Sequence, residues 1–194
     1  MAWDSNGTNN WATASLQVYL NGDYYNGLTS DAKKLLGDTY WNLGGSSSYT
    51  SDSNGLASHF YGYERGADVF NGYDAYWIGK LGLMYPSDYG YATSGGSTQN
   101  RTSCLNKALY NWKDSGYQDC INNNYLFKSD RSQWLISHDS TNSADVFNVY
   151  NSGWVDAYDI PFITNRSVSP TLYLKSTVQI TGGEGTQTSP YILG

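Results

Sequence analysis

The residues that most often carry out chemistry are few in this chain and poorly placed for catalysis. Its two cysteines, Cys104 and Cys120, lie 16 positions apart, and its histidines, His59 and His138, have no metal-ligand spacing. Two cysteines outside a zinc motif predict a disulfide, with two free buried thiols as the alternative. A disulfide would indicate an oxidising, exported setting.

Motifs of the common enzyme classes are also absent. The sequence has no Gly-x-Ser-x-Gly elbow, His-Glu-x-x-His helix, phosphate-binding glycine loop or dinucleotide fingerprint. Glycosidases need two carboxyl groups across a sugar-binding cleft. The only glutamates are Glu64 and Glu184, and aspartates such as Asp139 are scattered over predicted loops. The sequence therefore predicts no enzyme activity.

Calcium is the one metal that the oxygen-bearing side chains would suit. Asp145, Asn148, Asp156 and Asp159 could supply the oxygen ligands that this hard cation prefers. However, no loop has an ordered Asp-x-Asp-x-Asp spacing, and the Glu-Pro-Asn and Trp-Asn-Asp motifs of calcium-dependent lectins are absent. We expect no cofactor, with calcium as the alternative.

The composition excludes several kinds of partner. Only 14% of the 194 residues are charged and the net charge is −6, which argues against nucleic acid because that affinity comes largely from Lys and Arg. No apolar run approaches the ~18 residues of a membrane span, so no direct membrane insertion is expected. The 19 tyrosines and 7 tryptophans are numerous enough to build a core, and at a surface they resemble the composition of antibody paratopes.

The clearest β pattern lies in the C-terminal third. The apolar run 134–136 predicts a strand, and 145–150 and 154–158 alternate around a short glycine-containing loop, which predicts a hairpin. The run 171–174 predicts a last strand. Segment 154–163 mixes aromatics, aspartates and a proline, which is typical of a recognition loop on a rigid sheet.

Two helices are expected before this region. Apolar residues at helical spacing predict a first helix over 14–20 that stops at Asn21. Thr29 or Ser30 begins a second helix, which Gly37 ends.

The middle of the chain is expected to hold strands over 40–43, 59–63 and 77–85 and a short helix over 104–112. The residues predicted to lie in the core are Leu16, Leu20, Leu35, Trp77, Ile78, Leu81, Trp134, Leu135 and Leu172.

An ordered set of patterns resembles a family of bacterial surface domains. The patterns are Trp-Leu-x-Ser (134–137), Asn-Ser-x-x-Val-Phe-x-Val (142–149), Asn-Ser-Gly-x-Val (151–155) and Asn-Arg-x-Val-x-Pro-x-Leu-Tyr-Leu (165–174). That family has the C-type-lectin-like fold, in the branch that also contains the formylglycine-generating, sulfatase-modifying enzymes. Segments 16–28, 79–91 and 182–193 extend the resemblance to about two-thirds of the chain. The family usually has Arg where this chain has Ser169, which puts any contact of that Arg in doubt.

The resemblance implies one α+β, C-type-lectin-like domain over 1–194, with two N-terminal helices packed on short, mostly antiparallel sheets with long loops. Enzyme activity is not carried over. The formylglycine-generating enzymes use a redox-active cysteine pair close to the end of the chain, and no cysteine follows Cys120 here.

We therefore expect a non-enzymatic, adhesin-like domain, extracellular or on a cell surface, that binds a protein or glycan on another cell and is monomeric in isolation. The alternative is a structural head module of a pilin-like or wall-anchored surface protein without a ligand of its own. The residues expected to form the binding face are Asn148, Tyr150, Trp154, Asp156, Tyr158, Asp159 and Phe162.

Genetic diversification is a further hypothesis that follows from the resemblance. In some lectin-like proteins of this branch, a retroelement randomises exposed residues near the C-terminus. Applied to segment 156–163, the hypothesis requires Asp156, Tyr158, Asp159 and Phe162 to face solvent, because core positions do not tolerate randomisation.

Overall fold

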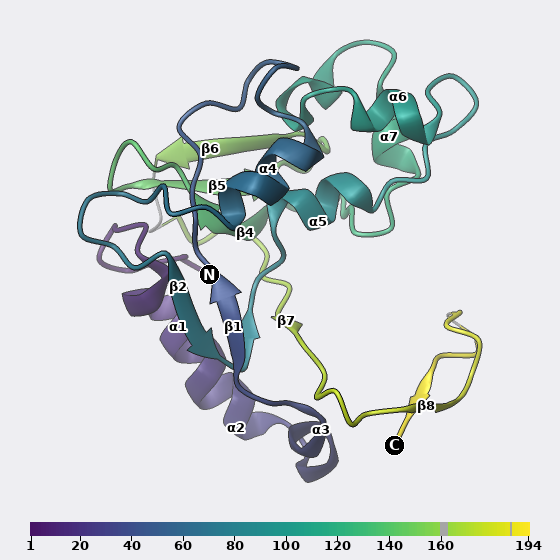
Figure 1. Ribbon diagram of the computed structural model, residues 1–194. Helices are drawn as coiled ribbons and strands as arrows, with labels where there is room; N and C mark the ends of the chain where they lie inside the picture. The colour runs from purple at the N-terminus through teal and green to yellow at the C-terminus, as the bar shows by residue number, and fades with distance from the viewer. Residues whose placement is uncertain (160–162, 187) are drawn as a thin grey trace.

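Helices and small antiparallel sheets alternate along the chain, which gives the α+β fold that the sequence predicts (Figure 1). The computed structural model describes residues 1–159, 163–186 and 188–194, without the side chains of Tyr158 and Asp159. The α-helices are α1 (Ser15–Tyr19), α2 (Tyr25–Gly27), α3 (Ser30–Leu35), α4 (Ala57–Glu64), α5 (Pro86–Tyr91), α6 (Arg101–Leu105) and α7 (Gln118–Asn122). Two 3₁₀ helices, η1 (Trp11–Thr13) and η3 (Leu109–Lys113), and a π-helix, η2 (Leu20–Tyr24), complete the helical set.

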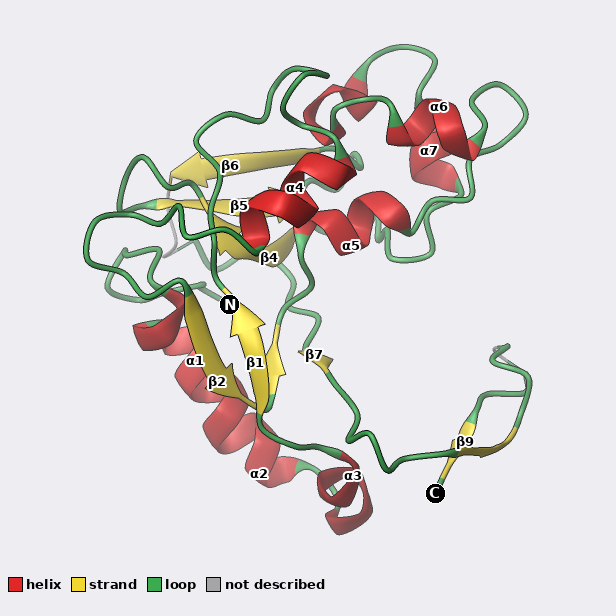
Figure 2. Cartoon of the chain, viewed as in Figure 1, coloured by secondary structure: helices red, strands yellow, loops and turns green. Residues whose placement is uncertain are grey.

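The strands form one three-stranded sheet, β4–β5–β6, and the pairs β1–β2, β3–β7 and β8–β9 (Figure 2). Their bounds are β1 (Thr39–Asn42), β2 (Tyr76–Gly79), β3 (Leu81–Gly82), β4 (Gln133–His138), β5 (Asp145–Val149), β6 (Val155–Asp159), β7 (Thr171–Leu172), β8 (Ile180–Gly182) and β9 (Ile192–Leu193). The predicted hairpin is confirmed, with Val149 of β5 paired with Val155 of β6.

Strand β4 separates two hydrophobic cores. All six of its residues are buried, and alternate side chains of a strand point to opposite faces. Trp134 and Ile136 join the core formed with α1, β1 and β3. Leu135, between them, joins the second core, formed with α4, α5 and the disulfide-bonded helices. One strand therefore serves both halves of the fold.

The first helix is longer than predicted. Residues 15–27 form one continuous helical run through α1, η2 and α2, so the expected stop at Asn21 is wrong. The Asn21 side chain does not cap the helix. Its Nδ2 donates to the carbonyl of Leu81, and its Oδ1 accepts from the backbone N–H groups of Lys80 and Leu81. This tertiary contact with β3 favours the continued helix. The predicted cap at Thr29 is confirmed, because Thr29 Oγ1 accepts from the N–H of Ala32.

The strand predicted over 59–63 is wrong, because these residues belong to α4. Their aromatic content favoured a strand, but the buried residues of this segment, Ala57, Phe60 and Glu64, follow helical spacing. Phe60 packs edge-on against Phe147 of β5, with ring centroids 5.2 Å apart, so the helix faces the second core.

The predicted core is correct for five of the nine residues, and two of the others are exposed. Ile78 is 59% exposed and Leu172 is 40% exposed. On β2 the inward position is taken by the neighbouring Gly79, and Ile78 lies opposite Tyr40 on the outer face of the pair. Five of the predicted residues are buried, namely Leu16, Leu20, Leu81, Trp134 and Leu135. Leu35 and Trp77 are only partly buried, and Leu36 takes the core position expected of Leu35.

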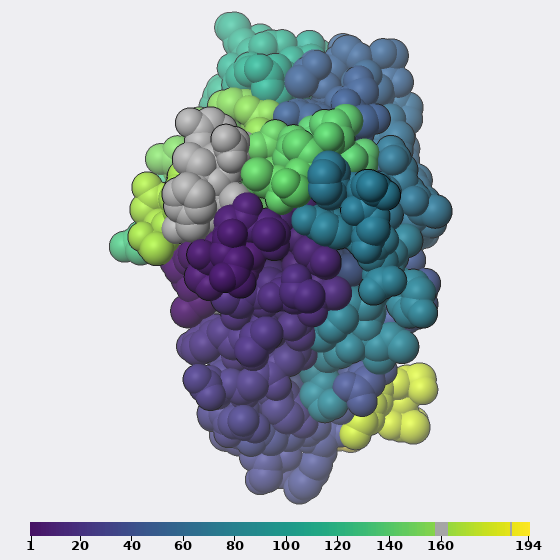
Figure 3. Space-filling model, turned by 90° about the vertical axis from the view of Figure 1, so that its left-hand side faces the viewer, coloured from purple at the N-terminus to yellow at the C-terminus, as the bar shows by residue number. Residues whose placement is uncertain are grey.

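The N-terminal segment lies against the loop that follows β4 (Figure 3). Asn9 is fully buried, and its Nδ2 lies within hydrogen-bond distance of the carbonyl oxygens of Asp139, Asn142 and Asp145. The Trp3 indole donates to the carbonyl of Leu135 at 3.0 Å. These contacts hold the beginning of the chain on the central sheet.

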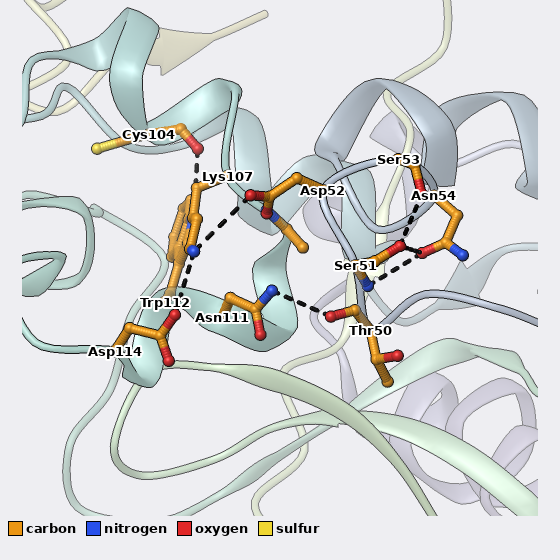
Figure 4. A network of polar contacts seen from close by, with 11 residues as sticks. Thr50, Ser51, Asp52, Ser53, Asn54, Cys104, Lys107, Asn111, Trp112 and Asp114 are labelled. Carbon is orange, nitrogen blue, oxygen red and sulfur yellow. Dashed lines mark hydrogen bonds and ion pairs between the residues drawn. The ribbon is translucent and has the colours of Figure 1, made fainter.

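The predicted disulfide is confirmed. It joins Cys104 of α6 to Cys120 of α7, with Cα atoms 5.5 Å apart, inside the second core. The surrounding loops are held by a polar network in which Lys107 forms ion pairs with Asp52 and Asp114 (Figure 4). The Trp112 indole donates to the carbonyl of Cys104.

After β7, the chain leaves the body of the domain (Figure 1). The N–H of Lys175 donates to the carbonyl of Leu35 at 2.9 Å, and the chain then forms the β8–β9 hairpin. Ile180, Tyr191 and Ile192 of this hairpin are more than half exposed. In the part of the chain that the structure describes, no helix is long and apolar enough to cross a membrane.

We predict that Leu135→Ala lowers the free energy of unfolding by about 2–5 kcal/mol, because it removes a fully buried side chain and leaves a cavity. Chemical denaturation of both proteins measures the difference. A loss below ~1 kcal/mol would show that Leu135 does not support the second core.

Acid should destabilise the protein through His138. This imidazole is buried at the end of β4, its Nε2 has no hydrogen-bond partner among the described residues, and burial lowers its pKa to about 4. The unfolded chain takes up this proton near pH ~6.5, so stability present above that pH is lost as the pH falls toward 4.

His138→Gln removes this titration. We expect urea titrations between pH 7 and pH 4.5 to show at least about 1.4 kcal/mol less acid destabilisation in the variant, the equivalent of one pKa unit. The change in unfolding free energy with pH is determined for each protein separately. Any effect of the substitution on stability at neutral pH therefore cancels. An equal loss in both proteins would contradict the prediction.

Candidate functional site

Three aromatic rings and two cationic side chains form a continuous stack beside the β5–β6 hairpin. We call it the aromatic ladder, and it consists of Arg166, Tyr150, Trp154, Tyr110 and Lys113. The three rings are partly buried, and Lys113 is exposed. One side of the ladder is therefore exposed to solvent, and the other side packs against the rest of the chain.

The members of the ladder are in close contact, with one parallel and one edge-on ring pair. The rings of Tyr150 and Trp154 are parallel to within 2°, with centroids 4.2 Å apart. Tyr110 meets Trp154 edge-on at 5.3 Å. The Lys113 ammonium lies 3.3 Å from the Tyr110 centroid and 4.3 Å from that of Trp154. At the other end, the Arg166 guanidinium lies 5.5 Å from the Tyr150 centroid. Such ring and cation contacts stabilise a fixed arrangement.

The hairpin turn fixes the two central rings. Gly153 has φ of +90°, and a Cβ there would meet the Ile121 side chain at 2.3 Å, so the position requires glycine. The Gly153 carbonyl accepts from the Tyr89 hydroxyl, which is buried in the second core. The Trp154 indole donates to Ser152 Oγ at 2.9 Å. The bond from Tyr89 thus holds the turn against the core, and the bond to Ser152 fixes the orientation of the Trp154 indole.

Tyr150 and Trp154 were both expected in the binding face, and the structure brings them together in the ladder. Asn148 was also expected there, and this expectation is wrong because the residue is fully buried. Its Nδ2 donates to the carbonyl of Asp156 across the hairpin. The alternation of β5 places Asn148 and Tyr150 on one face, but neighbouring elements cover the position of Asn148.

Asp156 is partly buried and is already engaged. Its Oδ1 accepts from the Tyr49 hydroxyl at 2.9 Å, and burial raises the pKa of the carboxyl group. The diversification hypothesis requires a solvent-facing side chain, and Asp156 is only partly exposed. The side chains of Tyr158 and Asp159 and the whole of Phe162 lie outside the described residues. The hypothesis for segment 156–163 stays a prediction.

Three members of the ladder were not expected from the sequence: Tyr110, Lys113 and Arg166. They come from η3 and from the segment before β7, far from the hairpin in the chain. The spacing of Tyr110 and Lys113 places both on one side of a helical turn, but nothing in the sequence indicates that this turn meets the hairpin.

Within residues 1–159, 163–186 and 188–194, no group of three or more His, Cys, Asp or Glu side chains is placed to hold an ion. Asp145, one of the predicted calcium ligands, instead accepts a hydrogen bond from the side chain of Asn142.

Comparisons of this chain with protein-family models, with curated proteins and with solved structures give no match.

The stacked pair should be energetically coupled. In a double-mutant cycle of Tyr150→Ala and Trp154→Ala, we expect a coupling free energy of about 0.5–1.5 kcal/mol, the usual contribution of an aromatic pair beyond its buried area. Urea unfolding of the four proteins measures it, and the cycle cancels the other contacts of each residue. Additive effects of the two substitutions would mean that the rings do not stabilise one another.

Proposed function

We propose that this chain is a non-enzymatic ligand-binding domain that works outside the cell or on a cell surface. It contacts a protein or glycan of another cell through the aromatic ladder. The observation that carries this proposal is the stack of Arg166, Tyr150, Trp154, Tyr110 and Lys113, which is partly exposed and held by the core behind it.

The residue types of the ladder suit recognition. Trp, Tyr and Arg dominate the binding energy of protein interfaces. Rings that are already stacked lose little conformational freedom when a partner binds. Lys113 and Arg166 also place positive charge at both ends of the ladder in a chain of net charge −6. That local charge would orient a partner with acidic groups.

The C-type-lectin-like fold belongs to the same proposal. Early helices, several small antiparallel sheets, long loops and a late hairpin occur in the order that the resemblance implies. The Cys104–Cys120 disulfide supports an oxidising location, where such bonds persist. The order of the elements and the disulfide therefore support the proposal of a surface domain.

A structural head module of a pilin-like or wall-anchored protein is the second candidate, and the β8–β9 hairpin favours it. The hairpin projects from the body and exposes Ile180, Tyr191 and Ile192. Exposed apolar side chains on a projecting element suit packing against a neighbouring domain.

Arrays of surface proteins and glycans, probed with the purified chain, test the two candidates. We expect at least one ligand whose binding weakens about tenfold or more in Trp154→Ala, because a central aromatic anchor is lost. Tyr40→Ala is the matched control: Tyr40 is also stacked, on Tyr76 at 4.8 Å, but lies on the outer face of β1.

Equal weakening in both variants would contradict a specific role of the ladder. An array without any ligand would contradict the binding function and favour the structural module. Circular dichroism of each variant establishes that the comparison is made between folded proteins.

A further inference from the structure

A cleft of about 520 Å³ opens between α4, α5, the segment after α7 and the residues that lead into β7. This volume lies within the range of roughly 300–1,000 Å³ typical of small-molecule sites. None of the five ladder residues lines it. The cleft is therefore a separate feature, and the proposed function does not use it.

Three tyrosines line the cleft, and the rings of two of them make no ring or cation contact among the described residues. Tyr91 and Tyr125 are 40% and 82% exposed, and neither ring contacts another ring or a cation among the described residues. Most other tyrosines of the chain do make such a contact. Tyr61 is held differently, because the Arg65 guanidinium lies 3.6 Å from its ring centroid. The cleft thus offers flat apolar faces to a ligand.

Gln133 supplies a polar group to the same cleft. The residue is 3% exposed and lines the cleft, yet its side-chain amide makes no hydrogen bond within the described part of the chain. Its position is fixed by β4, where it pairs with Val149 and bridges to Ser167. The amide is not among the buried polar atoms that lack a partner, so it is accessible from the cleft. A ligand with adjacent donor and acceptor groups would match both its N–H and its carbonyl group.

The cleft is lined by one acidic and one basic side chain, so its charges cancel. Asp88 and Lys128 lie in the lining, and neither forms an ion pair with a described residue. Asp88 Oδ2 accepts from the N–H of Tyr85, and Lys128 Nζ donates to Ser169 Oγ at 3.0 Å. Lys128 disfavours a cationic ligand and Asp88 an anionic one. Both retain capacity to hydrogen-bond a neutral molecule.

We propose that this cleft binds a neutral saccharide. The apolar C–H face of a sugar ring matches the tyrosine rings, and its neighbouring hydroxyl groups, each both donor and acceptor, match Gln133, Asp88 and Lys128. A proline-rich peptide also suits tyrosine-lined grooves. Proline nitrogens have no hydrogen to donate, so such a peptide leaves the Asp88 carboxylate poorly satisfied.

The site binds a sugar without hydrolysing it. Asp88 is the one carboxylate among the described residues of the lining, and glycoside hydrolysis needs two. Glu64 lies behind Ser87 and accepts hydrogen bonds from both the N–H and the hydroxyl of that residue. Its carboxyl group is therefore occupied and does not reach a ligand in the cleft.

Titration of the purified chain with a panel of neutral gluco-, galacto- and manno-oligosaccharides tests the proposal. The measurements are saturation-transfer NMR and calorimetry, in buffer with EDTA because none of these contacts uses a metal. We expect at least one oligosaccharide to bind. Its affinity should fall about tenfold or more in Tyr125→Ala. Because Tyr125 is 82% exposed, this variant should keep its fold.

Gln133→Ala should lower the affinity for the same oligosaccharide. Asp88→Asn should also lower this affinity, while it keeps the oxygen that accepts from the N–H of Tyr85 at the start of α5. Tyr40→Ala is the matched control, because Tyr40 is 55% exposed and lies outside both the cleft and the ladder, and it should leave the affinity unchanged. The variants at Tyr125, Gln133 and Asp88 leave the ladder intact, so this proposal and the ladder can fail independently. Absence of binding by every neutral oligosaccharide at millimolar concentration would overturn the proposal. Unchanged affinity in Tyr125→Ala would also do so, as would preference for a proline-rich, trimethyl-lysine or sialylated probe.

Discussion

The two-sided burial of β4 is the constraint on which the rest of the structure depends. Successive side chains of a strand point in opposite directions, and here both directions lead into a core. Trp134 and Ile136 close the core against the N-terminal helices, while Leu135 closes the one that contains the disulfide. A shift of one residue would exchange these side chains between cores of different shape. The register of β4 therefore fixes the relation between the two halves of the domain.

Long loops cover this frame, and asparagine and aspartate side chains hold many of their backbone groups. Asn9 faces three carbonyl groups of the segment after β4, and Asn21 pairs with both the N–H and the carbonyl of Leu81. Asp119 accepts from the N–H groups of Thr98 and Gln99. Short polar side chains are suited to this role because they reach nearby backbone groups with little loss of entropy. This explains how a chain with so little charge and so many irregular segments satisfies many of its backbone polar groups.

The ladder and the cleft are two ways in which the same sheet can support recognition. The ladder is a stack of rings along the hairpin, and it suits a partner that spreads over a surface. The cleft is concave and combines the rings of Tyr91 and Tyr125 with the side-chain amide of Gln133, and it suits a small ligand. Both are anchored in the β4–β5–β6 sheet, which lets side chains from loops be held without large movements. With both proposed sites, the chain would be able to contact a protein and a saccharide at the same time.

The sequence by itself determined the elements whose signals are local. The β5–β6 hairpin followed from alternation around Gly153, the start of α3 from Thr29, and the α+β class from their order. Tertiary structure decided what depends on contacts between distant segments. Residues 57–64 became α4 because helical spacing turns Phe60 toward the second core. The ladder and the cleft each gather side chains from several segments, and no local pattern records which segments will meet. Periodicity is a property of neighbours along the chain, whereas a binding site is a property of neighbours in space.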